Sequence, residues 1–166
     1  MSRGAFKVEV LASHHQRDVF ACGDVDLDRY LQTQATQDIR RHVAHCFVAV
    51  NSLGHVAGYY TLAASSVLLS DLPQEVIKKL PRYPTVPVAR MGRLAVSQSA
   101  QKMGLGAALL ADALTRVFHS DVAAYALIVD AKHEAAARFY EQHGFKRFSS
   151  QALNMWLPMN AVVSLM

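Results

Sequence analysis

The chain has 166 residues, of which 52% are hydrophobic and 18% are charged, and its formal net charge is +4. A chain of this length can bury a core without metals or disulfides, so a disulfide-stapled miniprotein is excluded. The cysteines, Cys22 and Cys46, match no zinc-site or disulfide spacing. No apolar run is long enough to cross a bilayer, and the first residues lack the pattern of a signal peptide. We therefore expect one cytoplasmic domain over residues 1–166, with no metal site and no membrane partner.

The positive charge is concentrated in one window of the sequence. Between Glu75 and Asp112 every charged residue is basic, and the rest of the chain is slightly acidic. The basic residues of this window are Lys78, Lys79, Arg82, Arg90, Arg93 and Lys102. Such a patch favours an anionic partner, either a phosphorylated cofactor or a nucleic acid. An ordinary solvated surface is the alternative interpretation.

The first third of the chain predicts a strand, a helix and a hairpin. Residues 6–11 alternate between apolar and polar side chains, which predicts a strand. Asp24 is a good N-cap for a helix, and apolar residues then recur at steps of three and four as far as Ile39. Two apolar runs, 45–50 and 55–62, flank a short loop that contains a glycine, which is typical of a hairpin.

The middle of the chain predicts a short helix, a strand and a long helix. Asp71 is expected to cap a helix that continues through Lys79, after which prolines force an extended connection. Residues 88–96 predict a central strand. The apolar stripe of residues 104–118 predicts an amphipathic helix.

The last third predicts a buried strand, a helix and a closing pair of strands. The strand covers residues 124–130, and the helix covers 133–143 and ends at Gly144, a favourable residue just beyond a helix end. Residues 145–148 and 153–157 are then expected to pair. This order of elements predicts an α/β fold with a mixed sheet and helices on both faces.

The loop Gln101–Ala107 lies between the predicted strand and the long helix. Its glycines let the backbone approach a ligand closely, and the first amides of a helix lack internal acceptors, so the loop can hold phosphate. Lys102 adds a cation. The spacing fits neither a Walker loop nor a dinucleotide fingerprint, and an ordinary strand-to-helix turn is the alternative.

Three segments together resemble the GCN5-related N-acetyltransferase (GNAT) superfamily: Gly92–Val96, Gln101–Ala107 and Ala137–Phe145, in this order and spacing. The resemblance implies the GNAT fold, a mixed and mostly antiparallel central sheet with helices on both faces, and acetyl-CoA as co-substrate. It implies that the loop binds the pyrophosphate, the preceding strand binds the pantetheine arm, and Tyr140 faces the thioester sulfur. The cofactor-binding residues it implies are Leu94, Ala95, Val96, Gln101, Lys102, Met103, Gly104, Leu105, Gly106, Ala107, Asp130 and Phe139.

A narrower resemblance covers most of the chain. The segments Phe20–Gly23, Leu27–Leu31, Gly58–Leu62, Leu80–Pro84, Arg90–Val96 and Val129–Lys132 resemble the acetyltransferase toxins of bacterial toxin–antitoxin modules. The resemblance implies acetylation of the α-amino group of aminoacyl-tRNA, neutralisation by a ribbon-helix-helix antitoxin, and a homodimer. Gln101 stands where many relatives carry arginine, which removes one possible phosphate contact.

The resemblance and the chemistry together suggest a role for each residue class. Tyr140 is the expected acid for the leaving thiolate, and a backbone amide of residues 94–96 is the expected oxyanion donor. No carboxylate stands out as a general base. The residues expected to contact tRNA are Lys78, Lys79, Arg82, Arg90 and Arg93. Regular alternation would put Arg90 and Arg93 on opposite faces of a strand, so both serve one site only if a bulge or twist intervenes.

Two other functions remain open from the sequence. A GNAT enzyme could act on a small amine or a protein amine instead of tRNA. A non-catalytic nucleic-acid-binding module would explain the basic window, but it leaves the loop Gln101–Ala107 and Tyr140 unexplained.

Overall fold

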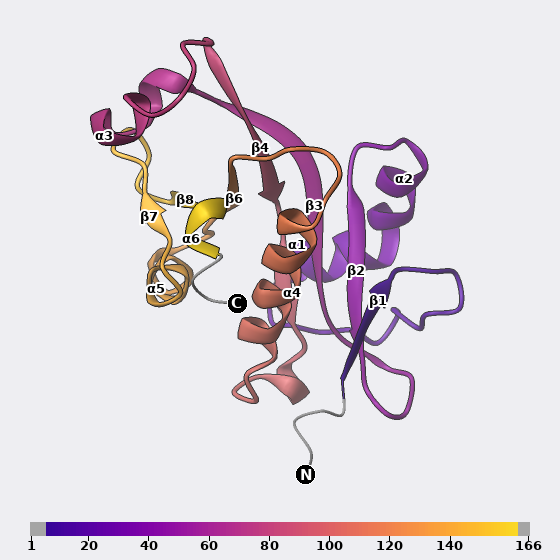
Figure 1. Ribbon diagram of the computed structural model, residues 1–166. Helices are drawn as coiled ribbons and strands as arrows, with labels where there is room; N and C mark the ends of the chain where they lie inside the picture. The colour runs from indigo at the N-terminus through magenta and orange to yellow at the C-terminus, as the bar shows by residue number, and fades with distance from the viewer. Residues whose placement is uncertain (1–5, 163–166) are drawn as a thin grey trace. The chain divides into compact units, whose positions relative to one another are not determined.

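The computed structural model describes residues 6–162, which form two compact units (Figure 1). The first unit contains residues up to Ala63 together with Gly92–Thr115, and the second contains Ala64–Met91 and the residues from Arg116 onward. Two elements run from one unit into the other: strand β3 (Val56–Leu68) and helix α4 (Leu105–Phe118).

The strands of the first unit pair antiparallel. Its strands are β1 (Lys7–Val10), β2 (His45–Val50), the first part of β3 and β5 (Leu94–Val96), and Figure 1 shows β1, β2 and β3 next to one another. The predicted hairpin of β2 and β3 is confirmed, and β3 continues beyond the predicted end at residue 62 to Leu68.

The helix predicted after Asp24 is present but interrupted. It consists of α1 (Val25–Arg29), a π-helical turn η2 (Tyr30–Gln34) and α2 (Ala35–Arg40). The Asp24 carboxylate accepts hydrogen bonds from the N–H groups of Asp26 and Leu27, as expected of an N-cap. The Thr33 hydroxyl donates to the Arg29 carbonyl at 2.8 Å and so competes with the regular helical bond in the π turn.

Helices cover both faces of the first unit's sheet, as the sequence predicts. On one face Val48 and Tyr59 pack with Leu31 of η2 and Ala35 of α2 in one apolar cluster. On the other face the Tyr60 hydroxyl donates to Asp112 of α4 at 2.5 Å. Adjacent strand residues point to opposite faces, which is why neighbouring tyrosines of β3 serve two separate cores.

In the second unit the strand order is the end of β3, then β4 (Thr85–Met91), β6 (Ala126–Asp130), β8 (Asn154–Pro158) and β7 (Lys146–Arg147). β4 and β6 are parallel, whereas β8 is antiparallel to both β6 and β7. The predicted closing pair of strands is therefore confirmed. Among the strands of residues 6–162, β4 and β6 pair in parallel, whereas β1–β2, β2–β3, β3–β5, β6–β8 and β7–β8 pair antiparallel, so the sheet is mixed and mostly antiparallel.

The single strand predicted for residues 88–96 is wrong, because it divides into β4 and β5 at Gly92 and Arg93. The physical reason is a change of partner along the chain. β4 pairs with β6, whereas β5 pairs with β3, and the Arg93 carbonyl accepts a hydrogen bond from the Thr61 N–H at 3.1 Å. Local alternation carries no information about such a change.

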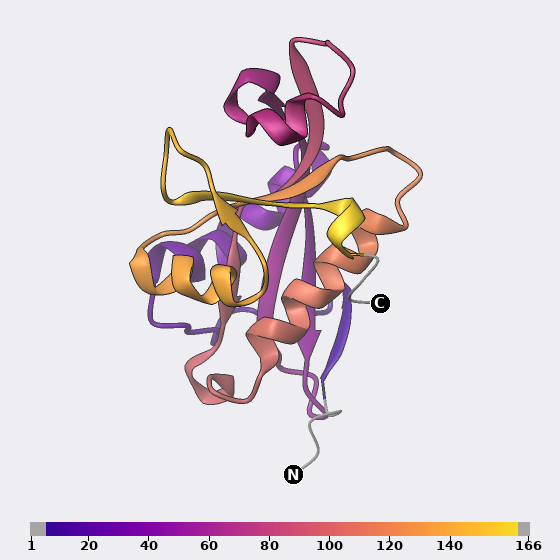
Figure 2. The ribbon, with the colours of Figure 1, turned by 60° about the vertical axis from the view of Figure 1, so that its left-hand side comes forward.

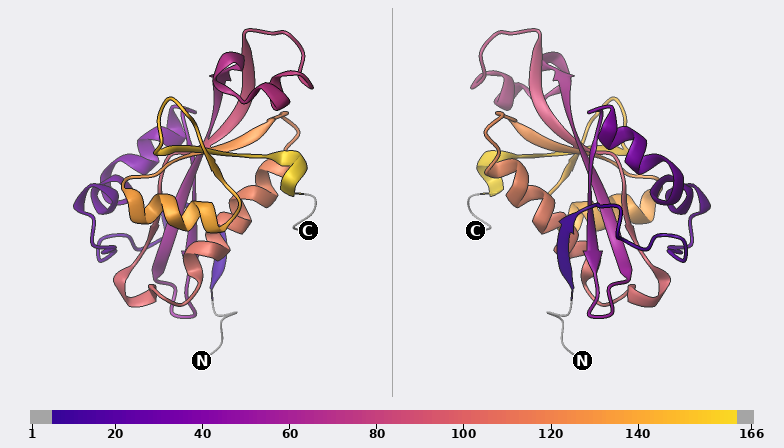
Figure 3. Two further views of the ribbon diagram at one scale, coloured as in Figure 1. Left: turned by 90° about the vertical axis from the view of Figure 1, so that its left-hand side faces the viewer. Right: turned by 90° about the vertical axis from the view of Figure 1, so that its right-hand side faces the viewer.

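The end of β3, the short helices η3 (Leu69–Asp71) and α3 (Gln74–Ile77), and the start of β4 form an arm of the second unit, and the loop between α3 and β4 lies at its tip (Figure 3). The prediction that Asp71 caps a helix reaching Lys79 is wrong. Pro73 is the N-cap residue, and Leu72 before it is extended and buried in the apolar cluster that also contains Phe148. Burial of Leu72 thus separates Asp71 from the helix.

Helix α5 (Glu134–Gln142) lies beside β7 in the second unit (Figure 2). His133 caps it by accepting a hydrogen bond from the Ala136 N–H at 3.2 Å, and Gly144 beyond its end has φ +96°, as the predicted helix stop requires. The remaining helices are η4 (Gln98–Ala100) in the first unit and α6 (Met159–Val162) in the second.

Candidate active site

The loop between β5 and α4 has the backbone geometry of an anion site. Lys102 and Gly104 both adopt the left-handed conformation, with φ +67° and +81°, and a Cβ at Gly104 would meet nothing within 4 Å. The Gly104 carbonyl accepts the hydrogen bond from the Ala108 N–H. The amides of the first helical turn, Leu105, Gly106 and Ala107, therefore lack helical acceptors and are available to a phosphate.

The other residues of the loop differ in exposure. Leu105 is buried and anchors the start of α4, Met103, Gly106 and Ala107 are half-buried, and Gln101, Lys102 and Gly104 are exposed. The positive charge of Lys102 thus lies on an exposed, left-handed residue three positions before the first residue of α4. This placement suits a cation that assists phosphate binding.

Gln101 holds the loop rather than pointing its amide at a ligand. Its Nε2 donates to the carbonyl oxygens of Val96 at 3.0 Å and Cys22 at 2.9 Å, so both amide hydrogens are used. Beside it, the Gln98 N–H donates to the Ala21 carbonyl at 2.8 Å. The loop is therefore fastened to the segment that precedes α1.

Strand β5 presents backbone groups on the side away from β3. Hydrogen bonds join Arg93 to Thr61 and Ser97 to Ala57, so every second residue of this stretch faces β3. The alternating pattern of an antiparallel pair leaves the N–H groups of Leu94 and Val96 pointing the other way, with Ala95 bonded toward β3. The N–H groups of Leu94 and Val96 are thus the candidate donors of this strand to a cofactor or oxyanion.

Tyr140 lies on α5 as a residue only 6% exposed, and its ring packs against Phe139 and Phe145. Within residues 6–162 its hydroxyl has no hydrogen-bond partner, and no fully buried side-chain oxygen there is left without one. The hydroxyl therefore reaches solvent at the end of a buried ring. Burial, and next the negative charge of Asp130, raise the pKa of Tyr140, so it stays protonated at neutral pH.

The hydroxyl groups of the other buried tyrosines already donate hydrogen bonds. Tyr30 donates to Asp38 at 2.7 Å, Tyr59 donates to the Leu27 carbonyl at 2.7 Å, and Tyr60 donates to Asp112. Among the buried tyrosines of the described residues, Tyr140 is the one with an available hydroxyl. The role that the sequence motif implies for Tyr140 stays a prediction, for which its hydroxyl is available.

Arg90 and Arg93 belong to different units and have different partners. Nη1 of Arg90 donates to both carboxylate oxygens of Asp130 at 2.7 Å. The guanidinium of Arg93 instead lies 3.6 Å from the centre of the Tyr30 ring. Asp130, a predicted cofactor-binding residue, thus has its carboxylate occupied by an arginine. The sequence does not reveal this pair, because 40 positions separate its members.

The remaining predicted residues lie in the second unit. Lys78 is the C-cap residue of α3, and Lys79 and Arg82 follow it. All three are exposed, on a segment that also carries the acidic Asp71 and Glu75. Phe139 is half-buried, with its ring 4.7 Å from that of His143. These positions are compatible with surface contacts to an anionic partner.

The cysteines are unsuited to nucleophilic chemistry. Both thiols are free, and burial raises the pKa of Cys22 to about 11 and that of Cys46 to about 12. At neutral pH both are therefore protonated, and the thiol is a poor nucleophile.

One group in the described residues has the side chains of a metal site: Glu9, His14 and His15. However, Nδ1 of His15 accepts a hydrogen bond from the Ala12 N–H at 2.8 Å, and Nε2 lies 2.7 Å from Glu9. Because Nδ1 is an acceptor, Nε2 carries the proton and donates to Glu9. Both ring nitrogens are used, so the group fastens the loop after β1.

Comparison with known proteins identifies the family. The sequence pattern of the acetyltransferase (GNAT) family matches residues 10–145. The chain belongs to this family. As a GNAT enzyme it is an acetyl-CoA-dependent acetyltransferase, which favours the catalytic interpretation over that of a non-catalytic nucleic-acid-binding module.

Several individual proteins are similar over nearly the whole chain. A "tRNA-acetylating toxin" of Mycobacterium tuberculosis is 34% identical over 142 residues, which are 84% of each chain. The solved structure of AtaT complexed with acetyl-methionyl-tRNAfMet is 28% identical, covers 96% of this chain and 98% of that one, and superposes with a TM-score of 0.90. The structure of AtaTR bound with acetyl-CoA is 27% identical, with coverages of 97% and 98% and a TM-score of 0.84.

In residues 6–162 we find no helix whose length and apolar character would allow it to cross a membrane.

Proposed function

We propose that this GNAT enzyme is the toxin of a toxin–antitoxin module, which transfers acetyl from acetyl-CoA to the α-amino group of aminoacyl-tRNA and thereby blocks translation. The observation that carries the proposal is the similarity to the tRNA-acetylating toxin of M. tuberculosis over 84% of the chain. The likeness to AtaT, solved with an acetylated aminoacyl-tRNA, supports the same acceptor. An acetylated α-amine has lost its nucleophilicity and cannot accept a peptide chain.

The proposal extends to the partners and organisation of the protein. AtaT has also been solved bound to the C-terminus of its antitoxin AtaR. For this chain we propose a ribbon-helix-helix antitoxin, a homodimer, and action in the cytoplasm as a single domain over residues 1–166. The match of one family pattern to residues of both compact units supports the single domain.

In the proposed mechanism the cofactor is held largely by backbone groups. The amides of Leu105, Gly106 and Ala107 bind the pyrophosphate, with Lys102 as an auxiliary cation, and β5 binds the pantetheine arm. The N–H groups of Leu94 and Val96 are the candidate donors for the oxyanion that develops on the thioester carbonyl. Preorganised amides of this kind need no rearrangement as charge develops.

The acetyl transfer itself needs a neutral amine and an acceptable leaving group. The α-amine attacks the thioester carbon, the C–N bond forms, the C–S bond breaks, and the proton lost by nitrogen is gained by the thiolate. An aminoacyl ester amine is less basic than a lysine amine, so much of it is neutral near pH 7 and no dedicated base is required.

Tyr140 is proposed to donate a hydrogen bond to the leaving sulfur. Because its pKa is raised while a thiol has a pKa of about 8.5, complete proton transfer from tyrosine to thiolate is uphill. The hydroxyl therefore stabilises the departing thiolate, and the proton released by the amine is the one that finally resides on sulfur.

The experiment that tests the function follows the acetyl group. The purified protein is incubated with acetyl-labelled acetyl-CoA and total aminoacylated tRNA, and in parallel with the same tRNA after deacylation. We expect label only on the aminoacylated sample, released by mild base as an N-acetyl-amino acid. Label on deacylated tRNA, on protein amines or on polyamines, but not on aminoacyl-tRNA, would refute the proposed acceptor.

A further inference from the structure

Arg93 is held in a fixed orientation by the helix that follows Asp24. Its guanidinium lies 3.6 Å from the centre of the Tyr30 ring, which is 3% exposed. The Tyr30 hydroxyl donates to Asp38 at 2.7 Å, and its ring stacks on Tyr59 at 6.2 Å with 14° between the planes. The aromatic surface under Arg93 is therefore rigid, and a cation over such a ring is stabilised by the ring quadrupole.

The hydrogen-bond donors of Arg93 are nevertheless unused. Within residues 6–162 its guanidinium makes no hydrogen bond and no ion pair, and the carboxylate nearest to its platform, Asp38, is engaged by Tyr30. Arg90 is the opposite case, because Asp130 neutralises it through both carboxylate oxygens and Ser65 lies 3.5 Å from its Nε. The guanidinium of Arg93 can thus bind an anion, whereas that of Arg90 is already paired with Asp130.

The backbone of Arg93 is also fixed. Its carbonyl accepts the Thr61 N–H, and the next residue begins β5, the strand proposed to bind pantetheine. Its side chain lies on the face of the sheet that carries Tyr30. A stacked guanidinium next to this strand offers planar, charged donors that suit a phosphate oxygen pair.

We propose that Arg93, and not Arg90, binds a backbone phosphate at the single-stranded 3′ end of the aminoacyl-tRNA acceptor, with Tyr30 as its platform. The inference rests on the proposed function, since it names a contact to that acceptor. Arg90 instead fastens the end of β4 to the end of β6 through Asp130. The break between β4 and β5 is what gives the two arginines separate tasks.

The test compares two matched variants, Arg93→Gln and Arg90→Gln, which each remove one positive charge. Binding of deacylated tRNA is measured at several salt concentrations, and acetyl-CoA affinity is measured separately. We expect Arg93→Gln to weaken tRNA binding about tenfold and to reduce the slope of log affinity against log salt by about 0.7, the value for one single-strand phosphate. Arg90→Gln should leave the slope unchanged, and acetyl-CoA affinity should be unchanged in Arg93→Gln.

Further variants cover the case in which Arg93→Gln folds poorly. Arg93→Lys keeps the charge, so it should retain the salt slope while binding tRNA more weakly. Tyr30→Phe keeps the aromatic ring, so it should retain both the salt slope and the affinity for tRNA. An unchanged slope in Arg93→Gln, an equal loss of slope in Arg90→Gln, or a loss of acetyl-CoA affinity in Arg93→Gln would overturn the inference. Failure of the wild-type protein to bind tRNA or acetylate aminoacyl-tRNA would instead overturn the proposed function.

Discussion

The side-chain amide of Gln101 donates a hydrogen bond of 2.9 Å to the backbone carbonyl of Cys22, 79 positions away in the sequence. The same nitrogen donates to the Val96 carbonyl at 3.0 Å, and the Cys22 N–H in turn donates to Asp28 of α1 at 2.9 Å. The start of the cofactor loop is thereby connected to the first helix. Preorganisation of the loop amides before acetyl-CoA arrives is the expected benefit.

The first prediction concerns the variant Gln101→Glu. The carboxylate has nearly the same shape but cannot donate, so two carbonyl oxygens would face a negative charge. We expect the dissociation constant of acetyl-CoA to rise about tenfold or more, because an ordered loop must then be formed during binding. Isothermal titration calorimetry with acetyl-CoA measures this directly.

Gln98→Glu is the matched control, since it places the same negative charge three residues earlier. No hydrogen bond is assigned to the Gln98 side chain in the described residues, so only the charge changes. If both variants weaken acetyl-CoA binding equally, charge repulsion explains the loss and the hydrogen bonds of Gln101 are unimportant.

The second prediction concerns Tyr140→Phe. Its hydroxyl makes no hydrogen bond within residues 6–162, so its removal should leave stability and acetyl-CoA affinity nearly unchanged. The rate of acetyl transfer should fall by about 10² to 10³, the usual contribution of one preorganised hydrogen-bond donor to developing negative charge. Single-turnover kinetics with aminoacyl-tRNA provide the measurement, and Tyr125→Phe serves as a control in the same unit. A Tyr140→Phe enzyme with wild-type turnover would remove Tyr140 from the mechanism.

The elements that the sequence predicts well are those fixed by local chemistry. Asp24 caps its helix and Gly144 ends another because these residues satisfy helix ends wherever they occur. The division of residues 88–96 escapes prediction because it depends on a change of strand partner. The hydrogen bonds of Gln101 at the site cannot be predicted either. Its partners are backbone carbonyls, which every residue has, so the sequence does not mark them. The pairing of Arg90 with Asp130 is equally non-local.

The third prediction concerns the close approach of β3 to α4 and β5 at Gly58. A Cβ added there would lie 2.9 Å from the Leu109 side chain and 3.0 Å from the Ala95 carbonyl oxygen. The backbone carbonyl belongs to the β3–β5 ladder and cannot move freely. Gly58→Ala should therefore lower the free energy of unfolding by about 1–3 kcal/mol, as overpacking of a core usually does.

Urea unfolding followed by circular dichroism measures this loss, with Gly92→Ala as the control. A Cβ at Gly92 would lie 3.4 Å from the Thr61 hydroxyl, an ordinary contact, and the expected change is below about 0.5 kcal/mol. Equal stability of Gly58→Ala and the wild type would show that β3 and α4 separate at little cost.

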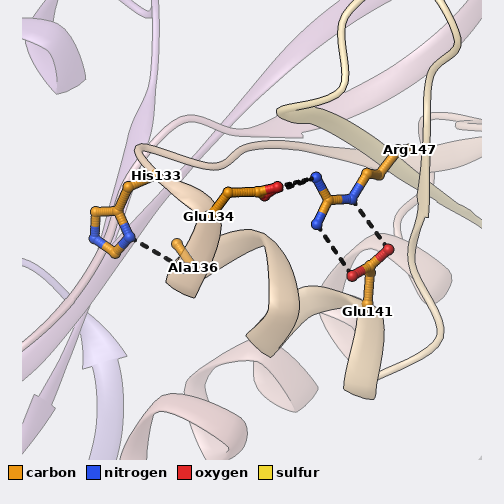
Figure 4. Close-up of polar contacts among 5 residues, drawn as sticks. All are labelled: His133, Glu134, Ala136, Glu141 and Arg147. Atoms are coloured by element: carbon orange, nitrogen blue, oxygen red, sulfur yellow. Dashed lines mark hydrogen bonds and ion pairs between the residues drawn. The ribbon is translucent and has the colours of Figure 1, made fainter.

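The fourth prediction concerns Arg147, which bridges the two ends of α5 (Figure 4). Its Nη1 donates to the Glu134 carboxylate at 2.7 Å, and its Nε donates to Glu141 at 3.0 Å. Glu134 in the first turn suits the helix dipole, whereas Glu141 near the end opposes it and gains from the arginine. Hydrogen bonding to Arg147 lowers the pKa of both carboxyl groups below the ordinary 4.5.

A carboxyl group whose pKa falls on folding contributes stability that is complete above its unfolded pKa of 4.5 and disappears as the pH drops through the lower, folded value. The melting temperature of the wild type should therefore exceed that of Arg147→Gln at pH 7, and the difference should shrink below pH 4.5. Arg138→Gln removes a charge from the same helix without breaking an ion pair of the described residues. Its melting temperature at pH 7 should therefore differ less from that of the wild type. Thermal unfolding from pH 7 to 3 checks both. A difference for Arg147→Gln that stays constant with pH would mean that Arg147 acts through the packing of its aliphatic stem and not through the carboxylates.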